Sequence, residues 1–176
     1  MYKKIFINFN FKKFIDAEYV EYETQSMKYW HENNKGSPVE EFYGLKLPET
    51  YCWENTRMKQ LVWNLEEVDT ESLAKLLKME IASISSIMQP PGSIIPVHVD
   101  SFFQLKKNFP NRPNPVRALI FMQDWKLGHF LQCNDDVYTK WKTGEGIIVS
   151  GDQLHLSANA GVENKYTLQV SGFVNE

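Results

Sequence analysis

The chain has 176 residues, with 19 basic and 22 acidic side chains and a formal net charge of −3. Its composition, 43% hydrophobic and 14% aromatic, provides enough apolar surface for one packed domain and excludes a wholly disordered chain. The slightly acidic balance lacks the clustered Lys and Arg that a nucleic-acid backbone requires, and no window approaches the roughly 20 apolar residues that span a bilayer. We therefore expect neither a nucleic-acid partner nor a membrane partner.

The amino terminus and the cysteines indicate where the protein works. The start, MYKKIFINFNFKKF, is basic, but polar residues interrupt the apolar core that a signal peptide needs, and we interpret residues 4–11 as a strand. Cys52 and Cys133 are far apart and show no paired ligand spacing, which favours a reducing compartment. We predict a cytoplasmic location.

The first 80 residues indicate a mixed, mainly helical region that supports the rest of a single domain, residues 1–176. Asn55 is a suitable cap for one helix, and Asp69 or Thr70 for the next. We expect loops at 36–38 and 44–48, and helices over about 15–31, 55–67 and 70–81.

The pattern changes in residues 81–174, where short runs of Ile, Val, Phe and Tyr recur about every ten residues between Gly, Pro and Asn turns. Such even spacing is typical of an all-β sandwich or barrel. We predict a mainly β fold, a double-stranded β-helix (jelly roll) with the N-terminal helices packed outside. Its strands are expected at 81–88, 94–99, 116–123, 129–133, 137–141, 145–150, 154–158 and 165–174.

Two histidines and one aspartate form the candidate metal site. His98 and Asp100 are two residues apart, so in an extended segment both side chains lie on one face. His155 follows a turn that contains Gly151 and Asp152. Two imidazoles and one carboxylate on a rigid β scaffold are the donors that hold iron(II) on one face of an octahedron. A His-x-Asp pair that is merely hydrogen-bonded is the alternative.

The last predicted strand, NKYTLQVSGF, carries polar residues on one face. Lys165 and Thr167 alternate with apolar residues, and polar groups that face an interior are costly unless they are paired or bind a ligand. A cation followed two positions later by a hydroxyl can hold a dicarboxylate. The alternative is an edge strand whose polar face lies in water.

The order of these residues resembles that of the iron(II)- and 2-oxoglutarate-dependent oxygenases. In both, His-x-Asp is followed by a histidine after a Gly-Asp turn, and then by a basic residue ten positions on with a hydroxyl two beyond it. The segment GDQLHLSANAGVENKYTLQVSGF is similar to the C-terminal strands of small hydroxylase-like members of bacteria and phages, and PPGSIIPVHVD is similar to the entry strand of prolyl and aspartyl/asparaginyl hydroxylases. The resemblance covers about residues 80–174.

The resemblance implies an iron(II) ion bound by His98, Asp100 and His155. It also implies that Lys165 and Thr167 hold the distal carboxylate of the co-substrate 2-oxoglutarate. Most such enzymes carry Arg at the Lys165 position, so a point charge replaces a bidentate fork here.

Two further residues are candidates for binding the co-substrate. Arg117 shares a face of its strand with Leu119 and Phe121, and it resembles the strand arginine of the aspartyl/asparaginyl hydroxylases. A pairing of Arg117 with an acidic group on the outer face is the alternative. Asn159 is a turn residue by chemistry, and in resembling sequences an Asn there lies close to the co-substrate.

The other histidines and one loop complete the candidates. We expect His129 to be structural rather than a fourth ligand, and His31 to be a satisfied or exposed side chain. Residues 101–115 are long for a jelly-roll connection, and long loops often bind ligands. This loop contributes the candidate substrate-binding residues Phe102, Phe103 and Gln104.

The resemblance implies a dioxygenase that hydroxylates a peptidyl side chain, of the proline or Asp/Asn type, or a small metabolite, with release of succinate and carbon dioxide. Two alternatives remain: a non-catalytic jelly-roll module that binds a ligand, and a cupin-like metalloprotein that needs no 2-oxoglutarate. The sequence leaves the substrate and the oligomeric state open.

Overall fold

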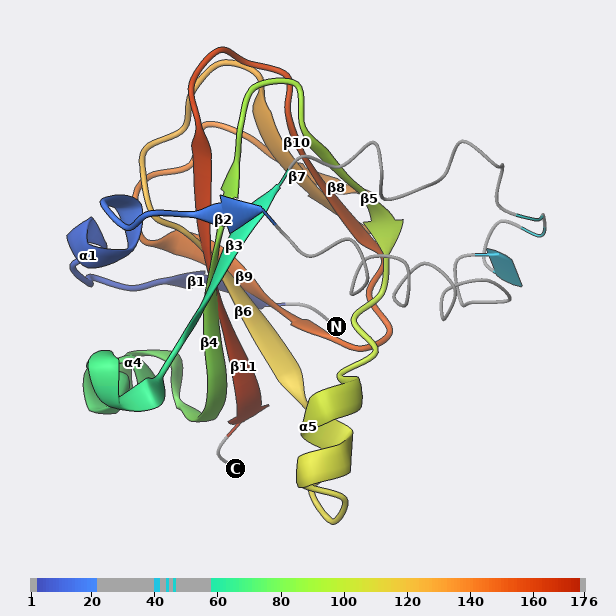
Figure 1. Cartoon of the computed structure of the whole chain (residues 1–176). Helices are drawn as coiled ribbons and strands as arrows, with labels where there is room; N and C mark the ends of the chain where they lie inside the picture. The colour runs from blue at the N-terminus through green and yellow to red at the C-terminus, as the bar shows by residue number, and fades with distance from the viewer. Residues whose placement is uncertain (1–2, 22–39, 42–43, 45, 47–57, 175–176) are drawn as a thin grey trace.

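The computed structural model describes residues 3–21, 40–41, 44, 46 and 58–174 (Figure 1). The N-terminal elements are β1 (Lys3–Phe6), α1 (Lys12–Ile15), β2 (Val20–Glu21), β3 (Lys59–Trp63), the 3₁₀ turn η2 (Leu65–Glu67) and α4 (Thr70–Leu77). The remaining elements are β4 (Met79–Gln89), β5 (Ile94–His98), α5 (Phe103–Asn108), β6 (Val116–Phe121), β7 (His129–Cys133), β8 (Asp136–Tyr138), β9 (Glu145–Ser150), β10 (His155–Asn159) and β11 (Lys165–Val174).

The strands form two antiparallel sheets, which confirms the predicted mainly β, double-stranded β-helix fold. The large sheet has the order β1-β9-β6-β11-β4-β3-β2, and the small sheet has the order β5-β10-β7-β8. Each of the eight strands predicted between residues 81 and 174 overlaps a strand of the structure. Within the described residues, no helix is long and apolar enough to cross a bilayer.

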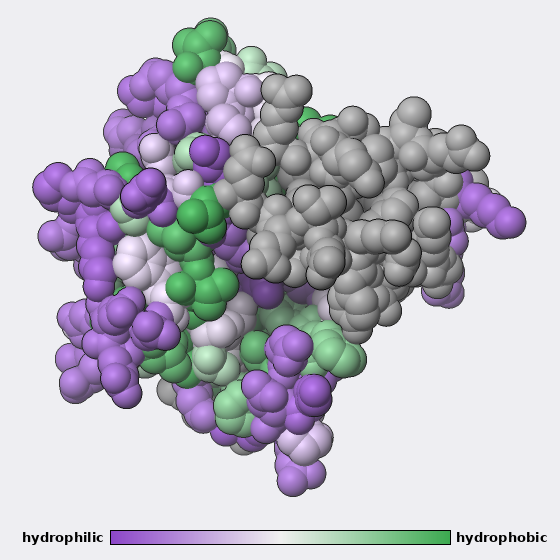
Figure 2. All heavy atoms as spheres, viewed as in Figure 1, coloured by the Kyte–Doolittle hydropathy of each residue, from purple (hydrophilic) through white to green (hydrophobic). Residues whose placement is uncertain are grey.

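The outer face of the large sheet is apolar and covered by α1 and α4 (Figure 1). Asp69 begins α4 as predicted, because its carboxylate accepts a hydrogen bond from the backbone N–H of Ser72 at 3.1 Å. Helix α4 ends at Leu77 rather than near residue 81, since Lys78 adopts the left-handed conformation with φ of 54°. The outward surfaces of α1 and α4 are mainly hydrophilic (Figure 2). The covered core includes Ile7, Phe11, Phe14, Leu73, Leu77, Ile84, Leu168 and Val170.

A second core lies between the two sheets, and the aromatic rings of Phe121 and Trp141 stack there with centroids 3.8 Å apart. It fills one end of the space between the sheets and leaves a cavity in the remainder. The core consists of Leu119, Phe121, Leu131, Cys133, Trp141, Ile147 and Val149.

Three predictions about local structure were wrong within the described residues. The helix expected over 55–67 is replaced at 59–63 by β3, which pairs with β4. Backbone pairing with β4 stabilises this segment more than the helical spacing of a few apolar residues would. The helix expected over 15–31 overlaps α1 only at Ile15, and most of that range lies outside the described residues. The loop expected over 101–115 contains α5.

Candidate metal centre

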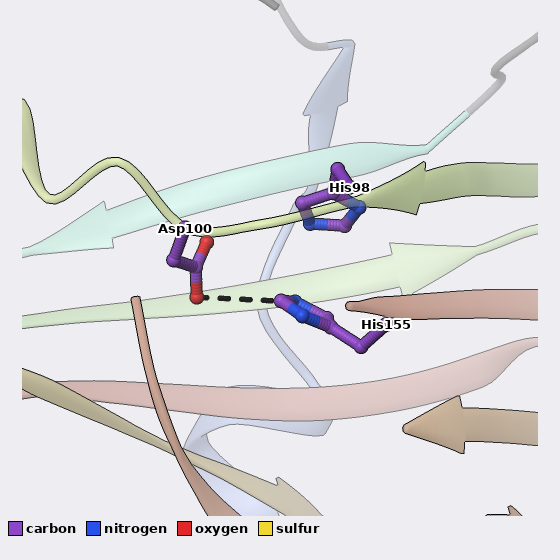
Figure 3. Close-up of side chains that lie close together, drawn as sticks. All are labelled: His98, Asp100 and His155. Carbon is purple, nitrogen blue, oxygen red and sulfur yellow. Dashed lines mark ion pairs between the residues drawn. The ribbon is translucent and has the colours of Figure 1, made fainter. Parts of the chain in front are cut away.

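The three predicted metal ligands come together at one end of the small sheet. His98 is the last residue of β5, His155 is the first residue of β10, and the two are direct partners in the antiparallel register. Asp100 follows β5 by two residues. One ligand atom from each residue lies within 4.8 Å of the other two, and all three side chains are buried. Figure 3 shows the three side chains pointing toward one another.

Backbone carbonyls hold both imidazoles in the tautomer that suits a metal. The Nδ1 atom of His98 lies 2.8 Å from the carbonyl oxygen of Pro96, and that of His155 lies 3.0 Å from the carbonyl oxygen of Gln153. Since a carbonyl only accepts, Nδ1 carries a proton in each ring, which leaves Nε2 as the ring atom available to a metal. Burial, followed by the neighbouring His155, lowers the pKa of His98 to about 3, so this ring is neutral.

The Asp100 carboxylate divides its two oxygens between an arginine and the histidines. Its Oδ1 accepts a hydrogen bond from Nη1 of Arg117 at 2.6 Å. Its Oδ2 is buried, accepts no hydrogen bond from the described residues, and lies 3.8 Å from Nε2 of His155. Burial by itself would raise the pKa of Asp100, but Arg117 and the two histidines outweigh it and the pKa is lowered.

The donor set therefore fits a divalent metal. An ionised carboxylate oxygen that lacks a partner inside a protein is costly, and a cation beside it removes that cost. Two imidazoles and one carboxylate also match the set that binds iron(II) while leaving positions open for other ligands. Among the described residues, this is the one group of three such side chains close enough to hold a metal.

The cluster lines a cavity of about 750 Å³ between the sheets and α5. The three predicted substrate-binding residues, Phe102, Phe103 and Gln104, all lie on its wall. Phe102 is buried and has a φ of 51°, the left-handed region, and Phe103 is 53% exposed. Thr167 also lines the cavity.

Strand β11 is a central strand, so its polar face does not lie at a sheet edge. It pairs with β4 on one side and with β6 on the other. Lys165 and Ser171 on this face are buried, and Thr167 and Gln169 are half-buried and line the cavity. The edge-strand alternative is therefore wrong.

Lys165 is a buried cation, 1% exposed. Its ammonium group donates to the Ser157 hydroxyl, and to Gln89 Oε1 and the Phe130 carbonyl oxygen at 3.1 Å each. No acidic side chain among the described residues pairs with it, and burial lowers its pKa to about 7. Lys165 does not itself line the cavity, but Ser157 and Gln89 do.

Arg117 lies at the opposite end of the same polar face. Its Nε donates to the Ser171 hydroxyl at 2.9 Å, and the antiparallel register places Ser171 beside Arg117. Ser171 is six residues from Lys165 along β11, which corresponds to about 20 Å in a strand. The structure thus pairs Arg117 with the Asp100 carboxylate inside the cavity, and not with an acidic group on the outer face.

Asn159 and His129 have structural partners. The Asn159 amide donates to the carbonyl oxygens of Gln89 and Glu163 at 2.8 Å each, and its Oδ1 accepts from Gly161, so it fastens a turn and does not line the cavity. The Nε2 atom of His129 lies 2.9 Å from the Glu163 carbonyl oxygen, and His129 is not part of the metal-ligand group. His31 and Cys52 lie outside the described residues.

Sequence reasoning missed Gln89 and Ser157, which contact the Lys165 ammonium group. The Ser157 hydroxyl also donates to Gln89 Oε1 at 2.6 Å. Ser157 could have been found from its position two residues after His155, because alternate residues of a strand share a face. Gln89 gave no signal of its own, since its place opposite Lys165 depends on the pairing of β4 with β11.

Comparison with known proteins supports the fold and goes no further. No protein-family model matches the chain, and no curated protein matches it by sequence. Among solved structures, the non-heme alpha-ketoglutarate-dependent epimerase SnoN of nogalamycin biosynthesis is similar, with a TM-score of 0.51 and 10% identity over 89% of this chain and 77% of that one. The chain shares its double-stranded β-helix fold with such proteins.

Two other solved structures show lower similarity. A prolyl-4-hydroxylase of Pseudomonas putida has a TM-score of 0.49 and 10% identity, over 99% of this chain and 92% of that one. A predicted oxalate decarboxylase of Thermotoga maritima has a TM-score of 0.43 and 14% identity, over 66% of this chain and 81% of that one.

Proposed function

We propose that this protein is an iron(II)- and 2-oxoglutarate-dependent dioxygenase that hydroxylates a peptidyl side chain or a small metabolite. The observation that carries the proposal is a buried cation, Lys165, that has no acidic partner among the described residues and lies next to the cavity that contains the His98, Asp100 and His155 cluster. A buried ammonium group without a counter-charge is costly, and an anionic ligand would compensate for it.

The spacing of the two features matches a short dicarboxylate. His155 and Ser157 both line the cavity from β10, two residues apart, which is about 6.7 Å along a strand. The Lys165 ammonium group donates to the Ser157 hydroxyl. The distance from the metal ligands to the cation is therefore comparable with the length of a five-carbon dicarboxylate.

Each residue then has a defined task. His98, Asp100 and His155 hold the iron, Lys165 binds the distal carboxylate of the co-substrate, and the Thr167 hydroxyl donates a hydrogen bond beside it. When bound, iron and 2-oxoglutarate supply an oxidation in which one atom of dioxygen enters succinate and the other the product hydroxyl, with loss of carbon dioxide. The walls of the cavity near the metal ligands, including the buried Phe102, limit the access of water to the reacting groups.

One observation favours a different function. All three N–H groups of the Lys165 ammonium already have acceptors within the protein, and its side chain lies behind those acceptors rather than on the cavity wall. A cupin-like metalloprotein that uses no 2-oxoglutarate would need no more than this structural role for Lys165. In the dioxygenase, the co-substrate displaces Gln89 or Ser157 from the ammonium group.

Anaerobic titration with iron(II) and then 2-oxoglutarate tests the proposal. We expect the weak visible charge-transfer band that forms when a 2-oxo acid chelates protein-bound iron. Lys165→Met should keep the metal but weaken 2-oxoglutarate binding by roughly 10- to 100-fold, since about 1.5–3 kcal/mol is typical for a charged hydrogen bond. Lys126→Met is the matched control, because Lys126 is exposed and forms an ion pair with Glu163 at 3.4 Å.

The outcomes separate the three functions. A band that is lost in Lys165→Met and kept in Lys126→Met supports the dioxygenase. Iron binding without any band in the wild-type protein would contradict the dioxygenase and favour the metalloprotein that needs no 2-oxoglutarate. A folded protein that binds no iron would leave a non-catalytic module.

A further inference from the structure

We infer that Arg117 is a binding site for a carboxylate group of the substrate, on the side of the metal ligands opposite to Lys165. This inference rests on the proposed function, because it assigns the substrate of that same cavity. The substrate would then carry a carboxylate close to the carbon that is hydroxylated.

The guanidinium group of Arg117 is only partly used by the protein. Of its five N–H groups, one on Nη1 donates to Asp100 and the one on Nε donates to Ser171. The other three have no partner among the described residues. The Arg117 side chain is 24% exposed and lines the cavity, so these donors remain accessible to a ligand.

The two cations of the site lie on opposite sides of the metal ligands. On β10, the step from His155 to Ser157 leads toward Lys165. Since β5 runs antiparallel to β10, the chain beyond His98 leads the other way, to Asp100 and its partner Arg117. A co-substrate that extends from Lys165 to the metal ligands therefore leaves Arg117 unoccupied.

The charges of the site leave room for one more anion. Asp100 and Arg117 balance each other, and they are the charged side chains among the described residues that line the cavity. The distal carboxylate of bound 2-oxoglutarate favours the protonated form of Lys165. Iron(II) and the ammonium group then carry three positive charges together, and the dianion 2-oxoglutarate neutralises two of them. One positive charge remains, and leaving a charge unbalanced in a buried site is unfavourable. A substrate with one carboxylate would neutralise it.

The surroundings of Arg117 indicate the rest of this substrate. The guanidinium carbon lies 5.4 Å from the centre of the Phe102 ring, and this cation–π contact orients the group. Phe103, Leu105 and Phe109 line the same cavity. A carboxylate attached to an apolar group fits this combination, because the arginine binds the charge and the aromatic wall covers the remainder.

A matched pair of probes tests the inference without turnover. The anaerobic complex with iron(II) and saturating 2-oxoglutarate is titrated with 3-phenylpropionate or with its amide, and binding is followed by calorimetry and by the charge-transfer band. Saturating 2-oxoglutarate keeps the probes away from Lys165. We expect the carboxylate to bind at least tenfold more tightly than the amide, and to shift the band because it binds beside the metal.

Variants of Arg117 identify the group responsible. Arg117→Gln should remove the preference for the carboxylate, and Arg117→Lys should keep part of it because it keeps the charge. Ser171→Ala is the matched control, since it removes a partner of Nε but leaves the guanidinium group in place. Iron content is measured first in each variant because Arg117 also contacts a metal ligand, and if Arg117→Gln loses iron, Arg117→Lys decides the test.

Two results would overturn the inference. One is equal affinity for the two probes, or no carboxylate binding at millimolar concentration, while the 2-oxoglutarate complex is intact. The other is a carboxylate preference that survives in an iron-loaded Arg117→Gln variant. Failure of the proposed function is distinguishable, because the wild-type protein would then form no 2-oxoglutarate band. In that case the same probes are titrated into the protein loaded with cobalt(II), whose visible absorption reports binding near the metal.

Discussion

The two faces of β11 differ in chemistry although they share one backbone. On the outer face, Leu168 and Val170 are fully buried in the core beneath α1 and α4. On the inner face, Lys165 is just as buried but is surrounded by polar groups beside the metal ligands. Apolar burial stabilises the fold, whereas a buried charge opposes it. The comparison teaches that the outer face holds the protein together, whereas the inner face carries a cost in stability that the proposed ligand binding explains.

The largest effect is expected from a metal ligand on the inner side of the fold. His98→Ala removes one of three donors and should abolish stoichiometric binding of iron(II) while the protein remains folded. Equilibrium dialysis with iron(II) or cobalt(II) measures the binding, and circular dichroism monitors folding.

A second histidine provides the matched control for this change. His129→Gln keeps a donor for the Glu163 carbonyl oxygen and lies outside the ligand group, so it should leave metal binding intact. Equal loss of binding in both variants would contradict the assignment of the cluster.

A substitution on the outer face of β11 should change the free energy of unfolding alone. Leu168→Ala leaves a cavity in the apolar core and should lower the free energy of unfolding by about 2–5 kcal/mol. Urea denaturation of the metal-free protein measures this loss. On the inner face, Gln169→Ala removes a half-buried side chain that lines the cavity and should cost far less. A larger loss from Gln169→Ala would reverse the roles given to the two faces.

Lys165 should make stability depend on pH. Its pKa is lowered to about 7 by burial, so between pH 7 and its ordinary value of 10.5 the unfolded chain binds a proton that the folded chain does not. The wild-type protein should therefore gain stability relative to Lys165→Met as the pH rises from 7 to 9. Urea denaturation of both proteins at several pH values measures the difference.

The groups around Lys165 allow the difference in pH dependence between the wild-type protein and Lys165→Met to be assigned to Lys165 itself. The hydrogen-bond acceptors on Gln89, Ser157 and Phe130 are neutral, and the Trp141 ring, whose centre lies 5.7 Å from the ammonium nitrogen, does not titrate. Among the described residues, His129 is a titratable group that the Lys165 charge affects, and its pKa is lowered mainly by burial, so it is neutral above pH 7. A difference between the two proteins that does not change with pH would contradict the burial of an ionisable ammonium group.

The smallest effect is expected from Thr167. Thr167→Val keeps the shape of the side chain but removes the hydroxyl, and should weaken 2-oxoglutarate binding by about 1 kcal/mol, roughly fivefold. Calorimetric titration of the iron-loaded protein measures the change. No change in affinity would place Thr167 outside the co-substrate site and leave Lys165 as the anchor.

Much of the fold was predictable because the strands carry local signals. Runs of β-branched and aromatic residues between turn residues marked all eight strands from β4 to β11. Strand β3 was mistaken for a helix, since Met58, Leu61, Val62 and Leu65 have helical spacing and only pairing with β4 decides the structure of this segment. Helix α5 was missed because its sequence has no capping residue: Phe102 occupies the N-cap without a side-chain hydrogen bond.

The sequence by itself determined the donor set, because two-residue spacing on a strand places His98 and Asp100 on one side, and a histidine after a turn can complete the set. It also determined the polar alternation of β11. Only the tertiary structure decided which groups the two cations contact. Arg117 meets Asp100, and Lys165 meets Ser157, because the pairing of β6 and β4 with β11 and the closure of one sheet over the other bring these residues together. Contacts of this kind join residues far apart in the chain, and no local pattern encodes them.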